Sequence, residues 1–79
     1  MTPSYHIGHR IKQVMWEKRM PAVRLAERIC VCRTHIYKIY EKDSIDTHLL
    51  MRISLALQHN FFAEIAGHIN ENLEDMSVQ

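Results

Sequence analysis

The chain has 79 residues, enough for one domain with a marginal core, and its 47% hydrophobic and 24% charged residues exclude wholesale disorder. No run approaches the roughly 20 apolar residues of a membrane span, and the N-terminus has no signal-peptide core, so we expect a cytoplasmic protein. The net charge of +1 is uneven: residues 1–42 hold nine bases and three acids, whereas residues 43–79 hold one base and six acids. A basic half suits phosphate, although charges that merely solvate helix faces are the alternative.

Apolar residues recur at helical spacing along the chain, and no segment alternates with the period of a strand. Ile7, Ile11, Val14 and Met15 form the first stripe, and Trp16 is expected to cover the core beside it. The pattern predicts five helices, at about 6–18, 22–29, 33–40 and 47–58, with the fifth inside 60–79.

Several residues mark the ends of these helices. Pro21 indicates the start of the second helix, and Asp46 and Asn60 are the expected N-caps of the fourth and fifth. Residues 75–79 are expected to be frayed.

The second and third predicted helices are short, and only about three residues separate them. That connection suits two helices that cross steeply, with the small Ala26 at the crossing and Val31 in the turn. Ile36 and Ile39 supply the inner face of the third helix. A generic helical bundle that uses the same apolar positions is the alternative.

These residues resemble a known family. The carriers are Ile7 and Ile11, the run Leu25 to Ile39, and the run Leu49 to Leu57. Together they are similar to the Cro/repressor-like helix-turn-helix family, also called the xenobiotic-response-element type. The resemblance implies an all-α, five-helix lambda-repressor-like domain with its helix-turn-helix at about 22–40. It also implies a sequence-specific DNA-binding transcriptional regulator, of the repressor kind, that binds a palindromic operator in double-stranded DNA as a homodimer.

The chain departs from the family pattern at the turn. Cys30 stands where glycine is usual, so a positive φ there would strain the backbone. Cys32 replaces the usual Ser or Thr cap of the third helix, and Pro21 and Ala22 replace a polar start of the second helix. The loop over 40–43 lacks the common glycine.

Turning Ile36 inward on the third helix leaves a polar outer face. The resemblance implies that its first, second and sixth positions read bases, which are Arg33, Thr34 and Lys38. The expected flanking and phosphate contacts are His35, Tyr37, Lys42, Arg24 and Arg10. A solvated polar face without a ligand is the competing interpretation.

A last apolar stripe runs along the predicted fifth helix and consists of Phe62, Ile65, Ile69 and Leu73. It extends beyond what a four-helix core needs, so we expect it to form the dimer interface. The competing view is that the stripe folds back on its own subunit.

The sequence carries no enzyme motif: Gly8 and Gly67 stand alone, and no catalytic residues, cofactor or small-molecule substrate are expected. Cys30 and Cys32 are too near each other for a good disulfide, which suits a reducing compartment, and their C-x-C spacing alone is a weak metal pattern, so no metal site is expected. His6 and His9 are expected to face solvent. The rival function is a protein-binding module, such as an antitoxin or adaptor, built on the same fold.

Overall fold

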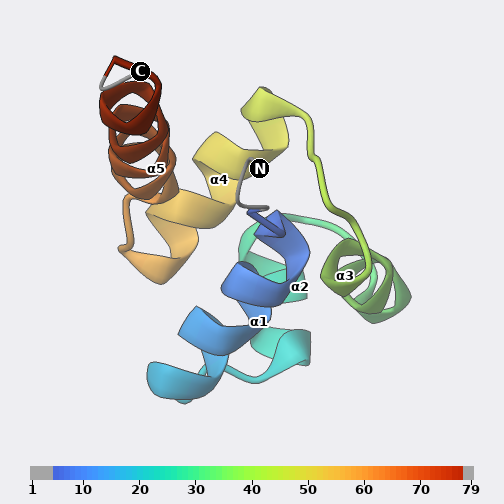
Figure 1. The fold of residues 1–79 in the computed structure, drawn as a ribbon. Coiled ribbons are helices and arrows are strands. Elements are labelled where there is room, and N and C mark those ends of the chain that lie inside the picture. Colours follow the sequence, from blue (N-terminus) through green and yellow to red (C-terminus); the bar gives the residue numbers. More distant parts are fainter. Residues whose placement is uncertain (1–4, 78–79) are drawn as a thin grey trace.

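The computed structural model describes residues 5–77, with side chains as far as residue 74. The described residues form five helices and no strand: α1 (Ile7–Glu17), α2 (Ala22–Arg28), α3 (Arg33–Tyr40), α4 (Thr47–Leu57) and α5 (Phe61–Ser77) (Figure 1). The all-helical prediction is therefore confirmed, with most helix bounds within a residue of expectation. The expected fraying is wrong for residues 75–77, which continue α5, while residues 78–79 lie outside the described part.

Side chains cap the helices where the sequence predicted them. The Asp46 carboxylate accepts the backbone N–H of His48 at 3.1 Å at the start of α4, and the Asn60 amide oxygen accepts that of Ala63 at 3.1 Å in α5. Each bond satisfies one of the N–H groups that a first helical turn leaves free. Before α1, His6 Nδ1 accepts the N–H of His9 at 3.1 Å, a cap that the sequence did not indicate.

Three helices end in a residue with left-handed backbone that is not glycine. The φ values are 56° at Arg19 after α1, 59° at Cys30 after α2 and 52° at Gln58 after α4. At α2 the N–H of Cys30 donates to the carbonyl of Glu27 and that of Val31 to the carbonyl of Ala26, the paired bonds of a Schellman motif. Cys30 thus has a positive φ, which strains a residue other than glycine, and its N–H takes part in this motif.

The core lies where α1, α2, α3 and α4 meet. α2 packs against α3 and α4, and α1 packs against α3 (Figure 1). Ala26 is buried and Val31 packs against the core, so both do what the short connection between α2 and α3 requires. Phe61, the first residue of α5, is fully buried, which attaches α5 to the body.

Gly8 sits where the backbone of α1 meets the end of α3. Its N–H donates to the carbonyl of Lys42 at 2.9 Å. A Cβ at this position would lie 2.4 Å from the carbonyl oxygen of Ile39, 2.5 Å from that of Tyr40 and 2.7 Å from that of Lys42. The close approach of two backbones therefore requires glycine, and it fixes the position of α3 against α1.

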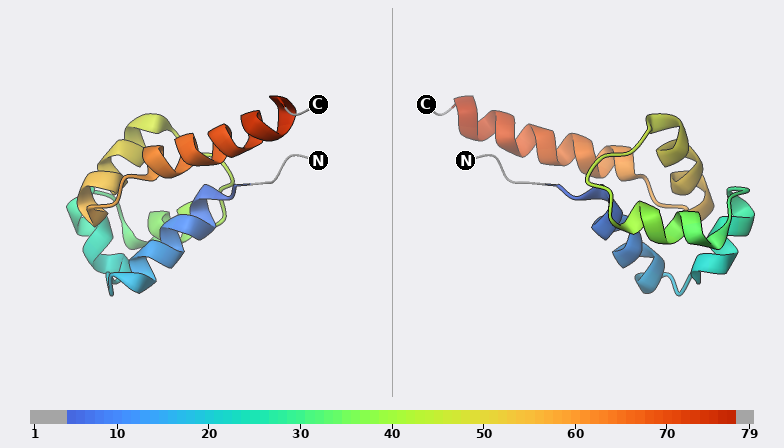
Figure 2. Two further views of the ribbon diagram at one scale, coloured as in Figure 1. Left: turned by 60° about the vertical axis from the view of Figure 1, so that its left-hand side comes forward. Right: turned by 90° about the vertical axis from the view of Figure 1, so that its right-hand side faces the viewer.

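α5 extends well beyond the other helices, which gives the molecule extents of 47 × 23 × 21 Å (Figure 2). Its first turns contact the body through Phe61 and Ile65, while its later part projects away. No helix in the described range 5–77 is both long and apolar enough to cross a membrane.

Trp16 corrects one core prediction. Met15 is buried as expected, but the Trp16 side chain is 81% exposed. The two residues are about 100° apart on the helix, and the stripe through Ile11 and Val14 already turns Met15 inward. Trp16 therefore lies on the solvent side of α1, one residue before the helix ends at Glu17.

Candidate nucleic-acid interface

α3 presents one buried face and one exposed polar face. Ile36 and Ile39 are at most 1% exposed and hold the helix against the core. Arg33, Thr34 and Lys38 are all exposed, as the helical wheel predicts. α3 thus packs on the core with the side that carries Ile36 and Ile39, and the outer face with Arg33, Thr34 and Lys38 is open to a ligand.

The first turn of α3 receives no hydrogen bond from a capping side chain. Cys32 occupies the N-cap position, and its thiol makes no capping hydrogen bond. The first turn contains no acidic residue, and Arg33 is its first residue. Because the early N–H groups of a helix have no partner within it, this end of α3 carries positive character without a neutralising side chain.

The basic side chains fall into three groups by the contacts that they make. Four bond within the fold: Arg10 to Glu64, Lys18 to the carbonyl of Gln58, Arg28 to the carbonyl of Ala56, and Arg52 to the carbonyl of Ile29. Lys12 instead lies over the ring of Tyr40, 5.4 Å from its centroid. Within the described part of the chain, the remaining cations have no hydrogen bond or ion pair: Arg19, Arg24, Arg33, Lys38 and Lys42.

The cations that bond within the fold have a structural role, whereas those without a partner are available to a ligand. Arg33 and Lys38 stand on the exposed face of α3, Lys42 follows that helix, and Arg24 lies in α2. These four residues are among the sequence-predicted DNA contacts, and all four are exposed. Their charges are not offset by an acidic partner among the described residues, which leaves them free for phosphate or base edges.

The predicted flanking residues lie beside this face. Tyr37 is half exposed, and its ring meets that of Tyr40 edge-on at 5.9 Å between centroids. His35 is half-buried in the first turn of α3. The backbone of Lys42 is held by Gly8, so the loop that carries its side chain is anchored to α1.

Arg10 has a different role from the phosphate contact that was expected. Its Nε donates to Glu64 Oε1 at 2.8 Å, and its Nη2 donates to Glu64 Oε2 at 2.9 Å. This paired geometry is the strongest that an arginine makes with a carboxylate. Glu64 lies 54 residues further along the chain, so the sequence contained no sign of the pairing.

Glu64 collects two further partners. The Tyr5 hydroxyl donates to Oε1 at 2.9 Å, and His59 Nε2 contacts Oε2. The paired hydrogen bonds from Arg10, followed by those from His59 and Tyr5, lower the pKa of Glu64 to about 2 against the opposing effect of burial. The cluster therefore ties α5 to α1 and to the chain before it.

Acid should weaken this attachment. Because the folded pKa of Glu64 lies below its ordinary value of 4.5, its contribution to stability is complete above 4.5 and is lost as the pH falls towards 2. Glu64→Gln should cost about 1–3 kcal/mol at neutral pH and should flatten the fall of stability over this pH range. Urea unfolding at stepped pH measures both effects. Equal acid dependence in the two proteins would show that Glu64 is not the titrating group.

The four residues predicted for the dimer interface do not lie on one surface. Ile65 packs against the core, whereas Phe62, Ile69 and Leu73 are exposed, the last two by 50% and 56%. Ile65 therefore belongs to the face that folds back, together with Phe61. Ala66, and not Ile65, lies on the outer face. This face therefore consists of Phe62, Ala66, Ile69 and Leu73.

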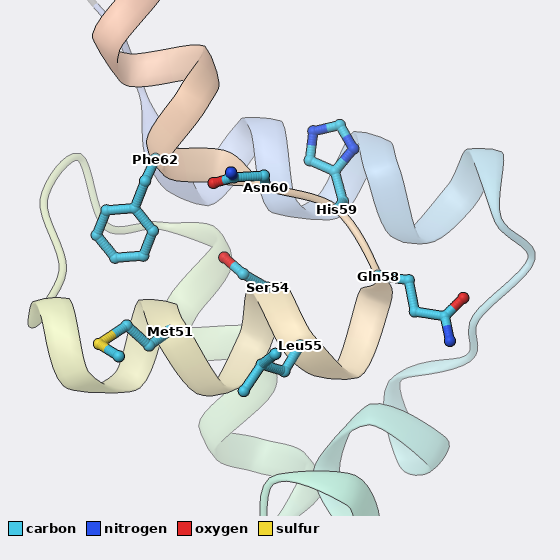
Figure 3. Close-up of a pocket in the computed structure, with 7 residues that line it drawn as sticks. All are labelled: Met51, Ser54, Leu55, Gln58, His59, Asn60 and Phe62. Carbon is cyan, nitrogen blue, oxygen red and sulfur yellow. The ribbon is translucent and has the colours of Figure 1, made fainter.

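α4 adds to this outer face residues that the sequence analysis did not select. Met51 and Leu55 are exposed, Leu55 by 79%, and with Phe62 they line a hollow of about 650 Å³ between α4 and α5 (Figure 3). Ser54 Oγ, which also lines the hollow, has no hydrogen-bond partner among the described residues. The sequence signal that could have found these residues is Leu55, an apolar residue at an outward position of a helix whose apolar face otherwise packs on the core.

Comparison of the chain with protein-family models, with curated proteins and with solved structures gave no significant match. In the described part of the chain, no group of three or more His, Cys, Asp or Glu side chains is placed to hold a metal ion.

Proposed function

We propose that the chain is a sequence-specific DNA-binding regulator in which α2, the turn and α3 form a helix-turn-helix of the lambda-repressor type. The observation that carries the proposal is the exposed face of α3, where Arg33 and Lys38 are without partners while Ile36 and Ile39 fix the helix from behind. A helix held rigidly by one face and basic on the other suits the major groove.

Base reading is assigned to three residues of this face. Arg33 can donate two hydrogen bonds to O6 and N7 of guanine, Lys38 reaches the same acceptors, and Thr34 can contact a thymine methyl group. Lys42 and Arg24 are assigned to phosphates, with His35 and Tyr37 flanking them. Arg10 is left out of this set, since Glu64 holds it.

Arg33→Ala and Lys42→Ala should separate these roles. The first should cost about 1–3 kcal/mol on the preferred site and relax the preference at one base pair, because a bidentate base contact is lost. The second should weaken all sequences about equally, because phosphate contacts carry no sequence information. Fluorescence anisotropy on the preferred and scrambled duplexes measures both, and thermal melting should show both variants folded. An Arg33 variant that keeps its site preference would refute the assignment of the reading face.

The regulator is proposed to act as a homodimer through the outer face of α4 and α5. Phe62, Ala66, Ile69 and Leu73 follow the alternating four- and three-residue spacing of helices that pair side by side. Among the residues whose side chains the structure describes, five of the eight exposed large hydrophobic ones belong to α4 and α5.

The charges of α5 permit a second copy to approach. The helix has no Lys or Arg, and the acids Glu64, Glu71 and Glu74 lie roughly 140–160° around the helix from Ile69. The apolar face is thus bordered by Asn70 and Ile65 rather than by acids, and two such faces can meet without like charges opposed. A repeated patch of this kind gives a two-fold axis and a palindromic site.

A protein-binding module is the second candidate, and the observation in its favour is the same apolar hollow between α4 and α5. The two functions differ in their need for α3. Charge reversal at Lys38 and Lys42 abolishes function in a DNA-binding protein, whereas it leaves a partner bound at Leu55 and Phe62 in place. The unpaired cations of α3 favour DNA.

A further inference from the structure

Two free thiols flank one residue of the turn between α2 and α3. Cys30 and Cys32 are both exposed and form no disulfide, while Val31 between them packs against the core. Because Val31 turns inward, the two cysteines that flank it lie on the solvent side of the turn.

The fold makes no use of either sulfur. Cys30 has a φ of 59°, a value at which glycine is less strained, and its backbone rather than its thiol closes α2. Cys32 occupies an N-cap position at which Ser, Thr, Asp or Asn would bond the next turn, and its thiol makes no such bond. Two cysteines at positions that other residues fill better, both reachable by solvent, indicate a role in thiol chemistry rather than in packing.

We propose that this turn is a thiol-modification site that controls DNA binding, with Cys32 as the controlling residue and an anionic low-molecular-weight disulfide as the reagent. The inference rests on the proposed function. In the exchange, the Cys32 thiol loses its proton and the sulfur attacks one sulfur of glutathione disulfide. A protein–glutathione S–S bond forms, the S–S bond of the reagent breaks, and the departing glutathione thiolate takes up a proton.

The place of Cys32 explains why its adduct would block DNA. It directly precedes Arg33 and stands at the end of α3 that carries both Arg33 and Thr34. An adduct there brings carboxylates to a surface that must meet phosphates, and it offers Arg33 an anionic partner in place of a base. Cys30 instead follows α2 and is three residues from Arg33 along the chain, whereas Cys32 is directly next to Arg33. Modification at Cys30 should therefore interfere much less.

Two single-cysteine variants test the proposal. The full-length wild type, Cys30→Ser and Cys32→Ser are first assayed in reduced form on duplex DNA by anisotropy. Each is then incubated with glutathione disulfide, and intact-mass spectrometry counts the adducts. Circular dichroism checks that each adduct is folded.

We expect one adduct on Cys30→Ser and a loss of DNA affinity of about tenfold or more, reversed by dithiothreitol. The adduct of Cys32→Ser should bind DNA nearly as its reduced form does. A folded Cys32 adduct that keeps its affinity overturns the inference, as does failure of Cys32 to form an adduct. Equal losses from the two adducts overturn the assignment to Cys32. A reduced wild type without DNA affinity refutes the proposed function itself, before any reagent is added.

Discussion

Gly8→Ala should destabilise the protein by about 3 kcal/mol or more, which is a large part of the stability of so small a domain. The new Cβ would lie within 2.7 Å of three backbone carbonyl oxygens, so α1 and the end of α3 would have to separate. Separation would also break the hydrogen bond from the Gly8 N–H to Lys42. A rotamer change cannot relieve these contacts, because the three nearest atoms all belong to the backbone.

Gly67→Ala is the matched control. Its Cβ would meet nothing within 4 Å, and Gly67 lies inside α5, so alanine should raise stability by about 0.5–1 kcal/mol. Urea unfolding of both variants against the wild type measures the contrast. If the two alanines have similar effects, the close approach of α1 to α3 is not as the structure has it.

Ile69→Asp should abolish the proposed dimer while leaving the subunit folded. Ile69 is half exposed and lies near the middle of the outer face of α5, so the charge costs little within one subunit but is buried without a partner between two. The variant should elute as a monomer and should lose about a hundredfold or more in affinity for a two-fold-symmetric site. Weak binding to unrelated duplex should remain, because Arg33 and Lys42 are untouched.

Gly67→Asp controls for charge alone. It adds the same carboxylate to the same helix, about 200° around from Ile69, and should leave the dimer intact. Analytical ultracentrifugation distinguishes the outcomes. A dimeric Ile69→Asp variant would place the interface elsewhere, and an unfolded one would mean that the outer face packs on its own subunit.

Local features of the fold were predictable, and its long-range contacts were not. Helical periodicity and the caps Asp46 and Asn60 placed five helices to within a residue or two, because these patterns lie inside one segment. Gly8 looked like an isolated glycine, since the carbonyls that require it come from residues 39, 40 and 42. The pairing of Arg10 with Glu64 was equally invisible, and it removed Arg10 from the candidate site.

The candidate site likewise contains residues that the sequence placed correctly and residues that it did not. The exposure of Arg33, Thr34 and Lys38 follows from the helical wheel once Ile36 is turned inward, so the sequence sufficed for α3. On α5 the sequence pattern put Phe62, Ile65, Ile69 and Leu73 in one stripe, and only the packing of Ile65 against the core beside Phe61 shows that Ile65 belongs to another face. Trp16 was misplaced because Met15, directly before it on α1, takes the inward position, and the Trp16 side chain is left exposed.

Selection of bound sequences from a pool of random duplexes tests the central proposal most directly, with the purified 79-residue chain as the bait. The account predicts enrichment of a two-fold-symmetric site whose half-sites are centred one DNA turn apart, about 34 Å. It further predicts that Arg33→Ala loses the preference at one position of each half-site. Recovery of the input pool without enrichment would contradict the proposal that α3 reads DNA sequence.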